Sequence, residues 1–214
     1  MSASNPCSAV LQFNRSLRFC KGAPLAPGIK PHIYAISKSD ITTWPTRPSG
    51  TPSEDGLDSV TNGYVLSDNF VLAADKAWHR IDLVENVGTL HWETQGGQYS
   101  RTFKADFEVR FPDATDPQAA YLQYRAVNDD VVYLVPSRTG KYYLVGNPLY
   151  RTETTANATF GEGVDADDNG AAFAVECTDI FPPLHYSGNI VTENEGTISG
   201  ATGNPVVVTP TQTN

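Results

Sequence analysis

One short segment has residue types and a spacing that suit a bound cation. Asp165, Asp167 and Asn169 alternate along the chain, Gly170 follows directly, and Glu176 comes six residues after the glycine. This fits the calcium-loop pattern, which places oxygen ligands at positions 1, 3 and 5, a glycine at 6 and a bidentate carboxylate at 12. The candidate metal ligands are therefore Asp165, Asp167, Asn169 and Glu176.

The sequence around this pattern favours a polar turn over a calcium loop. An EF-hand needs a helix on each side, whereas residues 154–160 and 171–177 are rich in Thr, Ala, Phe and Val and predict strands. Asn169 and Gly170 tolerate the positive φ that hairpin turns require. We therefore expect a hairpin turn here, with a bound cation as the alternative.

The remaining reactive residues form no catalytic pattern. His32, His79, His91 and His185 lack metal-ligand spacing, and the chain has no HExxH, GxSxG or phosphate-binding glycine motif. The acidic pairs at 106/108 and 129/130 fit solvated carboxylates better than a glycosidase pair. We predict no enzyme activity and no cofactor.

The three tryptophans allow two interpretations. Trp44 falls in a predicted loop and Trp78 and Trp92 fall on predicted strands. They could stack on a sugar, but packing in a core or an interface is the favoured interpretation.

Composition excludes some classes of protein. The chain has 214 residues, 40% of them hydrophobic, and a net charge of −9, which argues against a basic nucleic-acid-binding surface. Such acidity serves solubility, or makes a wall that nucleic acid can pass without sticking. There is no apolar run long enough for a membrane-spanning helix, and no secretory pattern opens the sequence.

Cysteine usage favours reduced thiols in a protein made in a cytosol. The three residues, Cys7, Cys20 and Cys177, are odd in number and have no CxxC spacing. A bridge between Cys7 and Cys20 stays open as an alternative.

The segment from Gly63 to Pro148 predicts a series of strands interrupted by one helix. The expected strands are 63–72, 77–84, 89–94, 100–111, 130–135 and 141–145. Asp116 or Thr115 can cap a helix with Pro117 in its first turn, and Ala120, Leu122 or Tyr121, and Tyr124 are expected on its inner side. A further hairpin is expected from 152–160 and 171–178, and 181–186 closes the core.

Residues 100–111 show the clearest alternation. Phe103, Ala105, Phe107, Val109 and Phe111 share one face, and Lys104, Asp106, Glu108 and Arg110 share the other. This pattern predicts a strand with one buried face and one face against water or a partner. The fully apolar run Val131–Val135 predicts a central strand.

These observations predict a mainly β fold: a β-sandwich or partial barrel with one short α-helix, a long loop and extended terminal arms. The expected divisions are an N-terminal arm at 1–30, a β-sandwich domain at 31–187 and a C-terminal arm at 188–214. The domain contains a long loop at 44–62, rich in Pro and Gly, and the helix at 116–127.

This order of elements resembles the tail tube (major tail) proteins of tailed bacteriophages. The best-matching stretch is Phe103–Gly146: a strand ending at Phe111-Pro, a short helix, and the hairpin of Asp130-Val-Val-Tyr-Leu-Val and Lys141-Tyr-Tyr-Leu-Val. The resemblance covers about two thirds of the chain and is architectural, with no diagnostic signature.

The resemblance implies a virion structural protein located in the tail and made in the bacterial host cytoplasm. Such subunits form homo-oligomeric rings, usually of six, which stack into a tube around an acidic channel for DNA passage. Partners would be further copies, other virion proteins, and DNA that passes without specific binding, but no membrane. Asp106 and Glu108 would face the lumen, although Lys104 and Arg110 share their face. The loop 44–62 and both arms would clasp the next ring.

Two alternatives belong to other classes. A capsid decoration protein or a neck or tail-terminator protein would differ from a tube subunit only in its symmetry partner. A calcium- or carbohydrate-binding β module would instead show a melting temperature that rises with calcium and responds to Asp165→Ala and Glu176→Ala. A hydrolase is the interpretation that the residues support least.

Overall fold

The structure is a computed structural model, and it describes residues 26–47, 64–85, 87–98, 100–111, 116–127, 130–159 and 170–206. The strands are β1 (His32–Ser37), β2 (Ile41–Thr43), β3 (Val65–Leu66), β4 (Val71–Leu72), β5 (His79–Asp82), β6 (Thr89–Gln95), β7 (Thr102–Phe111), β8 (Val131–Pro136), β9 (Tyr142–Val145), β10 (Thr152–Thr159), β11 (Gly170–Asp179), β12 (His185–Tyr186), β13 (Asn189–Val191) and β14 (Thr197–Ser199). One α-helix, α3 (Asp116–Val127), and a short 3₁₀ turn, η1 (Lys38–Asp40), complete the described elements.

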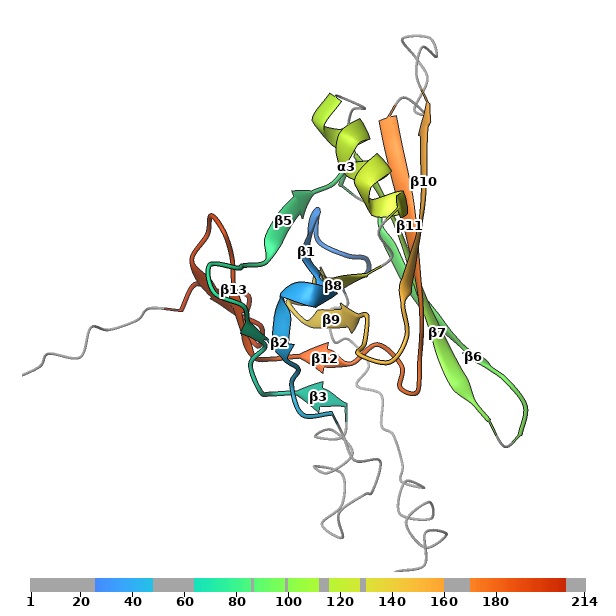
Figure 1. Cartoon of the computed structure of the whole chain (residues 1–214), viewed down its shortest axis with the longest axis vertical. Coiled ribbons are helices and arrows are strands. Elements are labelled where there is room, and N and C mark those ends of the chain that lie inside the picture. Colours follow the sequence, from blue (N-terminus) through green and yellow to red (C-terminus); the bar gives the residue numbers. More distant parts are fainter. Residues whose placement is uncertain are drawn as a thin grey trace, which may run out of the picture.

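Two sheets packed face to face form the body of the molecule. One has six strands in the order β3-β12-β9-β8-β1-β5, and the other has four in the order β10-β11-β7-β6. Figure 1 shows the four-stranded sheet as a tall layer beside the six-stranded sheet, with α3 near its upper end. Two further pairs, β13-β14 and β2-β4, flank the six-stranded sheet. The mainly β class with one short helix is confirmed, and the described strands form no closed barrel.

The six-stranded sheet is buried on both faces. In β8, Val131, Tyr133 and Val135 point into the core between the two sheets. Val132 and Leu134 point the other way, into a second core with Trp78. Every residue of β8 is buried, and β8 lies between β9 and β1, so the predicted central strand is confirmed.

The four-stranded sheet buries one face only. On β7, the side chains of Ala105, Phe107, Val109 and Phe111 are buried, and the residues between them are half-buried or exposed. β7 pairs with β11 on one side and β6 on the other, and both pairings are antiparallel. The predicted hairpin around residues 161–170 is also confirmed, since β10 pairs with β11 from Thr152↔Cys177 to Thr159↔Gly170.

Helix α3 begins at Asp116 and ends at Val127, as predicted, but its inner side differs. Leu122 and Arg125 are the buried residues, and Tyr121 packs against the core between the sheets. Ala120 is exposed and Tyr124 is 55% exposed, so neither lies on the inner side as expected. The helix is rotated so that Arg125 is buried, with its guanidinium over the ring of Tyr121.

The segment 63–72, expected as one strand, contains two short ones in different sheets. β3 pairs with β12 in the six-stranded sheet, and β4 pairs with β2. Between them the chain turns so that Phe70 enters the second core, where its ring meets those of Trp78 and Tyr186. Long-range pairing thus divides a locally uniform apolar run.

The predicted C-terminal arm is wrong for residues 188–206. Ile190 on β13 is fully buried in the second core and Ile198 on β14 is 6% exposed. Trp78 also bridges to Thr192, and its N–H donates to the carbonyl of Val191 at 2.8 Å. The hairpin therefore belongs to the body, because its alternating isoleucines cover the outer face of the six-stranded sheet.

Parts of the predicted N-terminal arm (1–30) and of the predicted long loop (44–62) also pack against the two-sheet body. Ile29, placed in the N-terminal arm, is buried in the core between the sheets. At the start of the long loop, Trp44 packs edge-on against Phe70 and Arg47 forms an ion pair with Asp179. Residues 1–25, 48–63 and 207–214 lie outside the described residues.

A pair of adjacent substitutions on β13 tests the correction to the C-terminal arm. Ile190→Ala should lower the free energy of unfolding by about 2–5 kcal/mol, because it removes a fully buried side chain. Val191→Ala is the matched control: its side chain is 46% exposed on the same strand, and we expect a change within about 0.5 kcal/mol. Urea unfolding measures both. Equal, small effects would mean that the hairpin is a detachable arm.

Candidate functional site

The proposed calcium pattern is split by the structure. Asp165, Asp167 and Asn169 lie outside the described residues, whereas Glu176 lies in the middle of the extended strand β11. Glu176 lies six positions along the strand from Gly170, which is a distance of about 20 Å. The Glu176 carboxylate accepts a charge-assisted hydrogen bond from Lys104 at 2.8 Å. Glu176 therefore cannot fold back as the twelfth ligand of an EF-hand loop.

Strand pairing, rather than cation binding, explains why position 170 is a glycine. Its φ is +145°, and a Cβ built there would lie 2.8 Å from the carbonyl oxygen of Phe111 on the neighbouring strand. Only glycine fits such a backbone and such an approach without strain. The glycine of the pattern is thus explained by strand pairing, as expected for a hairpin turn.

The histidines lie apart and have separate partners. His79 bonds to Glu193 at 2.8 Å, His91 lies 3.9 Å from Asp106, and the ring of His185 packs beside Tyr143. His32 packs edge-on against Tyr34. Within the described ranges, no group of three His, Cys, Asp or Glu side chains is placed to hold a metal ion.

The tryptophans do not form a common surface. Trp78 is 1% exposed in the second core, and Trp44 reaches it only through Phe70. Trp92 belongs to the other sheet, where its ring packs against Phe103. This arrangement agrees with packing and provides no sugar platform made of all three rings.

Cys177 is a buried, unreactive thiol. It is 3% exposed, and the side-chain amide of Asn147 donates to its Sγ at 3.3 Å. Burial raises the pKa of the thiol to about 12, with a further contribution from the negative charge of Asp179. Cys7 and Cys20 lie outside the described residues.

The outer face of the four-stranded sheet carries a row of carboxylates. Across the sheet, Glu153 on β10 is opposite Glu176 on β11, which is opposite Asp106 on β7. His91 on β6 ends the row. Like charges directly opposite each other on neighbouring strands oppose folding, and the ion pair of Lys104 with Glu176 offsets only part of that repulsion.

The same face is acidic beyond the row. Its strand residues include the acids Glu93, Asp106, Glu108, Glu153 and Glu176 and the cations Lys104 and Arg110, so five negative and two positive charges leave −3 with His91 neutral. The bond to Glu176 is the largest cause of the raised pKa of Lys104, although burial acts weakly against it. The predicted wet face is confirmed, and Lys104 neutralises only part of it.

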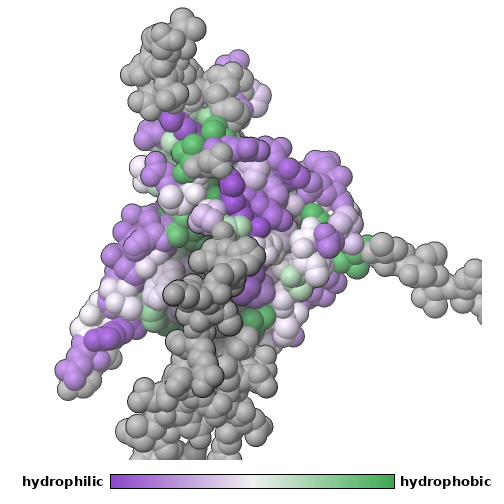
Figure 2. Space-filling view, turned by 180° about the vertical axis from the view of Figure 1, so that it is seen from behind, coloured by the Kyte–Doolittle hydropathy of each residue, from purple (hydrophilic) through white to green (hydrophobic). Residues whose placement is uncertain are grey.

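The sheet also has two free edges. Among the described residues, no strand pairs with the outer side of β6, which has seven residues, or of β10, which has eight. Unpaired strand edges of this length are templates for pairing with another chain. The hairpin of β6 and β7 extends past the six-stranded sheet, and Figure 2 shows it as a mainly hydrophilic projection at the lower left.

Comparison with protein-family models, curated proteins and solved structures finds no match for this chain. Within the described residues, no helix has the length and apolar character needed to cross a membrane.

Removing one charge from the acidic row should not weaken the isolated chain. Glu153→Gln should leave the free energy of unfolding unchanged or raise it by up to about 0.5 kcal/mol, because it relieves repulsion from Glu176. Glu85→Gln makes the same change of net charge at an exposed position outside the strands. Urea unfolding at low and at 1 M salt compares the two, and the difference should shrink at high salt. A loss above about 1 kcal/mol for Glu153→Gln alone would show that the row is stabilising.

His32 should make stability depend on pH. Its pKa is lowered from 6.5 to about 4, chiefly by burial and then by the positive charges of Arg80 and Lys30, with Glu195 and Asp82 acting in the opposite direction. Because the folded-state pKa lies below the unfolded value, this contribution is fully present above pH 6.5 and is lost as the pH falls toward 4. His32→Gln should reduce the fall in melting temperature that the wild type shows between pH 6.5 and 4. An identical pH profile in the variant would contradict the assignment.

Proposed function

We propose that this chain is a virion structural protein that closes into rings through the free edges of its four-stranded sheet, as a subunit of a bacteriophage tail tube. The observation that carries the proposal is the combination, on one sheet, of an acidic outer face with two edges to which no described strand pairs. The architectural resemblance given above supports the same function.

The strand directions suit closure by rotation. Successive pairs in the order β10-β11-β7-β6 are all antiparallel, so β10 and β6 run in opposite directions. In a ring whose axis follows the strands, β6 of one copy would meet β10 of the next in an antiparallel pair. Such a head-to-tail contact closes when its rotation allows, and closure removes every free edge.

The size of such a ring suits a channel. Six copies of a four-stranded sheet give 24 strands; at about 4.8 Å per strand the diameter between backbones is at least about 37 Å. Side chains occupy about 5 Å on each side, and strand tilt widens the barrel further. The opening would admit a nucleic-acid duplex.

The acidic face would line this channel. The core between the sheets places the six-stranded sheet on one side of the four-stranded sheet, which leaves the carboxylate row on the open side. A negative wall repels phosphate, so DNA can slide without binding. Asp106 and Glu108 thereby keep their expected lumen positions, joined by Glu153 and Glu176.

The contacts between rings follow from the resemblance. The loop 44–62 and the terminal segments remain the proposed clasps, but residues 188–206 belong to the body and are removed from this role. Decoration, neck and terminator roles would use the same edges with other partners. The calcium-binding alternative is less favoured, because Glu176, its proposed twelfth ligand, lies on β11 and pairs with Lys104.

Electron microscopy of negatively stained, purified protein, together with mass photometry, tests the proposal. We expect rings or tubes, with multimers that persist on dilution. A monomer that stays monodisperse at high concentration would contradict it. Single rings that do not stack would favour a neck or terminator role, since these lack the repeating partner.

Two adjacent proline substitutions on β6 separate folding from assembly. Neighbouring residues of an antiparallel strand direct their N–H groups to opposite sides, and proline removes that donor. Glu93 and Thr94 are both exposed, so neither change removes a core side chain. One of Glu93→Pro and Thr94→Pro should abolish rings while keeping the far-ultraviolet circular dichroism of the wild type. The other should disturb the hairpin itself. Rings that form in both variants would exclude β6 from the interface.

A further inference from the structure

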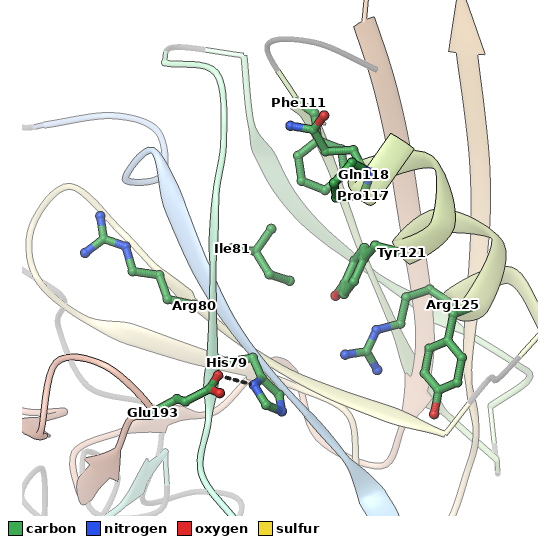
Figure 3. Close-up of a pocket in the computed structure, with 10 residues that line it drawn as sticks. His79, Arg80, Ile81, Phe111, Pro117, Gln118, Tyr121, Arg125 and Glu193 are labelled. Atoms are coloured by element: carbon green, nitrogen blue, oxygen red, sulfur yellow. Dashed lines mark hydrogen bonds and ion pairs between the residues drawn. The ribbon is translucent and has the colours of Figure 1, made fainter. Parts of the chain in front are cut away.

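A cavity lies between α3 and β5, away from the outer face described above. Its volume is about 550 Å³, and its lining combines apolar side chains such as Ile81, Phe111 and Pro117 with several charged ones. Figure 3 shows Tyr121 and Arg125 extending from α3 toward β5, on the opposite side of the cavity from Arg80 and His79.

Arg125 is the unusual member of this cavity. The residue is 4% exposed, yet its Nε and Nη1 are buried and have no hydrogen-bond partner within the described ranges. The guanidinium lies over the ring of Tyr121, 4.8 Å from its centroid, and 5.7 Å from that of Tyr124. A ring face attracts the charge but offers no acceptor in the plane of the guanidinium, where the N–H groups point.

The other charged groups of the cavity are already paired. Arg80 bonds to Asp82 and Glu195, and Glu193, the one carboxylate among the lining residues, bonds to His79 at 2.8 Å. Arg125 lies in the last turn of α3, where the helix dipole favours a cation without supplying an acceptor for its fork. Among the described residues, no carboxylate pairs with Arg125, so its positive charge faces the cavity without a partner there.

More unpaired polar groups lie beside Arg125. The hydroxyls of Tyr121, Tyr133 and Thr154 are buried without a hydrogen-bond partner among the described residues. Burial is the largest cause of the raised pKa of Tyr121 and of Tyr133; Arg125 acts against the rise in both, and Thr154 acts against it at Tyr133. Unpaired buried groups rarely cluster unless a ligand or water completes them.

We propose that this cavity binds a carboxylate through the guanidinium of Arg125, with the apolar lining taking the carbon atoms next to it. A carboxylate has the planar pair of oxygens that fits the guanidinium fork. It also carries the single negative charge that balances one free cation, whereas a phosphate dianion would bring an excess charge next to Glu193. The carboxylate comes from a small molecule or from an acidic side chain of a second copy.

Thermal melting of the full chain tests the site with sodium butyrate against sodium chloride at equal ionic strength. Wild type should show a saturable rise in melting temperature, about 3–6 °C at ten times the dissociation constant. Arg125→Gln should remove the rise. Arg80→Gln removes a positive charge from the same cavity and should keep it, because Arg80 is held by two carboxylates.

Mass photometry separates the two sources of carboxylate. If a second copy supplies it, butyrate and Arg125→Gln should both shift the protein toward smaller species; if a small molecule does, the mass distribution should not change.

Should Arg125→Gln fail to fold, Arg125→Lys should fold and show a weakened butyrate response. The site is refuted if butyrate has no effect on wild-type melting or mass, or if Arg125→Met keeps the wild-type response. The proposed rings form through the edges of β6 and β10 and do not require Arg125, so the site and the proposed function can fail separately.

Discussion

The six-stranded sheet must be covered on both faces, and the rest of the structure depends on this. β8 alternates its side chains between two cores, so Tyr133 and Leu134, adjacent in sequence, contact different layers. One face is covered by the four-stranded sheet and α3. The other is covered by loops and short strands that contribute Phe70, Trp78 and Ile190. Each of these elements has its place because it removes apolar surface of this sheet from water.

The four-stranded sheet is under a weaker constraint. It must bury only the face that meets β8 and its neighbours, so among the described residues the opposite face and the outer backbone edges of β6 and β10 take no part in the core. That freedom allows Glu153, Glu176 and Asp106 to stand opposite one another, although a neutral row would fold more easily. The proposed channel would give this charged face a role that the fold of the isolated chain does not require.

Patterns that depend on near neighbours in the chain were readable from the sequence. The alternation in 100–111, the apolar run of β8, the bounds of α3 and the hairpin around 161–170 are of this kind. Segment 63–72 was not readable, because its division depends on pairing with β12 and β2, distant in sequence. Ile190 and Ile198 likewise look like isolated apolar residues in a polar tail. Their place in the second core depends on the pairing of Trp78 with Thr192, which is distant from it in sequence.

The two features of the sites that sequence reasoning missed are both non-local. Asp106 was a candidate from alternation alone, but the row with Glu176 and Glu153 appears only when the register of three strands is known. Glu176 is a candidate cation ligand in the sequence alternative to a polar turn, whereas in the fold its carboxylate pairs with Lys104. Arg125 had no local signal, since a helix of this composition favours aromatic residues on its inner side and a guanidinium in water.

The acidic row and the unpaired guanidinium share a physical consequence. The row sets like charges against each other, and Arg125 keeps a charge away from water without a carboxylate, so each feature reduces the stability of the chain by itself. Domains are stable by only about 5–15 kcal/mol, so a chain holds few such features unless something outside it offsets them. Edge pairing would add backbone hydrogen bonds to β6 and β10, and a carboxylate would complete Arg125. The proposed ring and the proposed carboxylate would each offset one of these two costs.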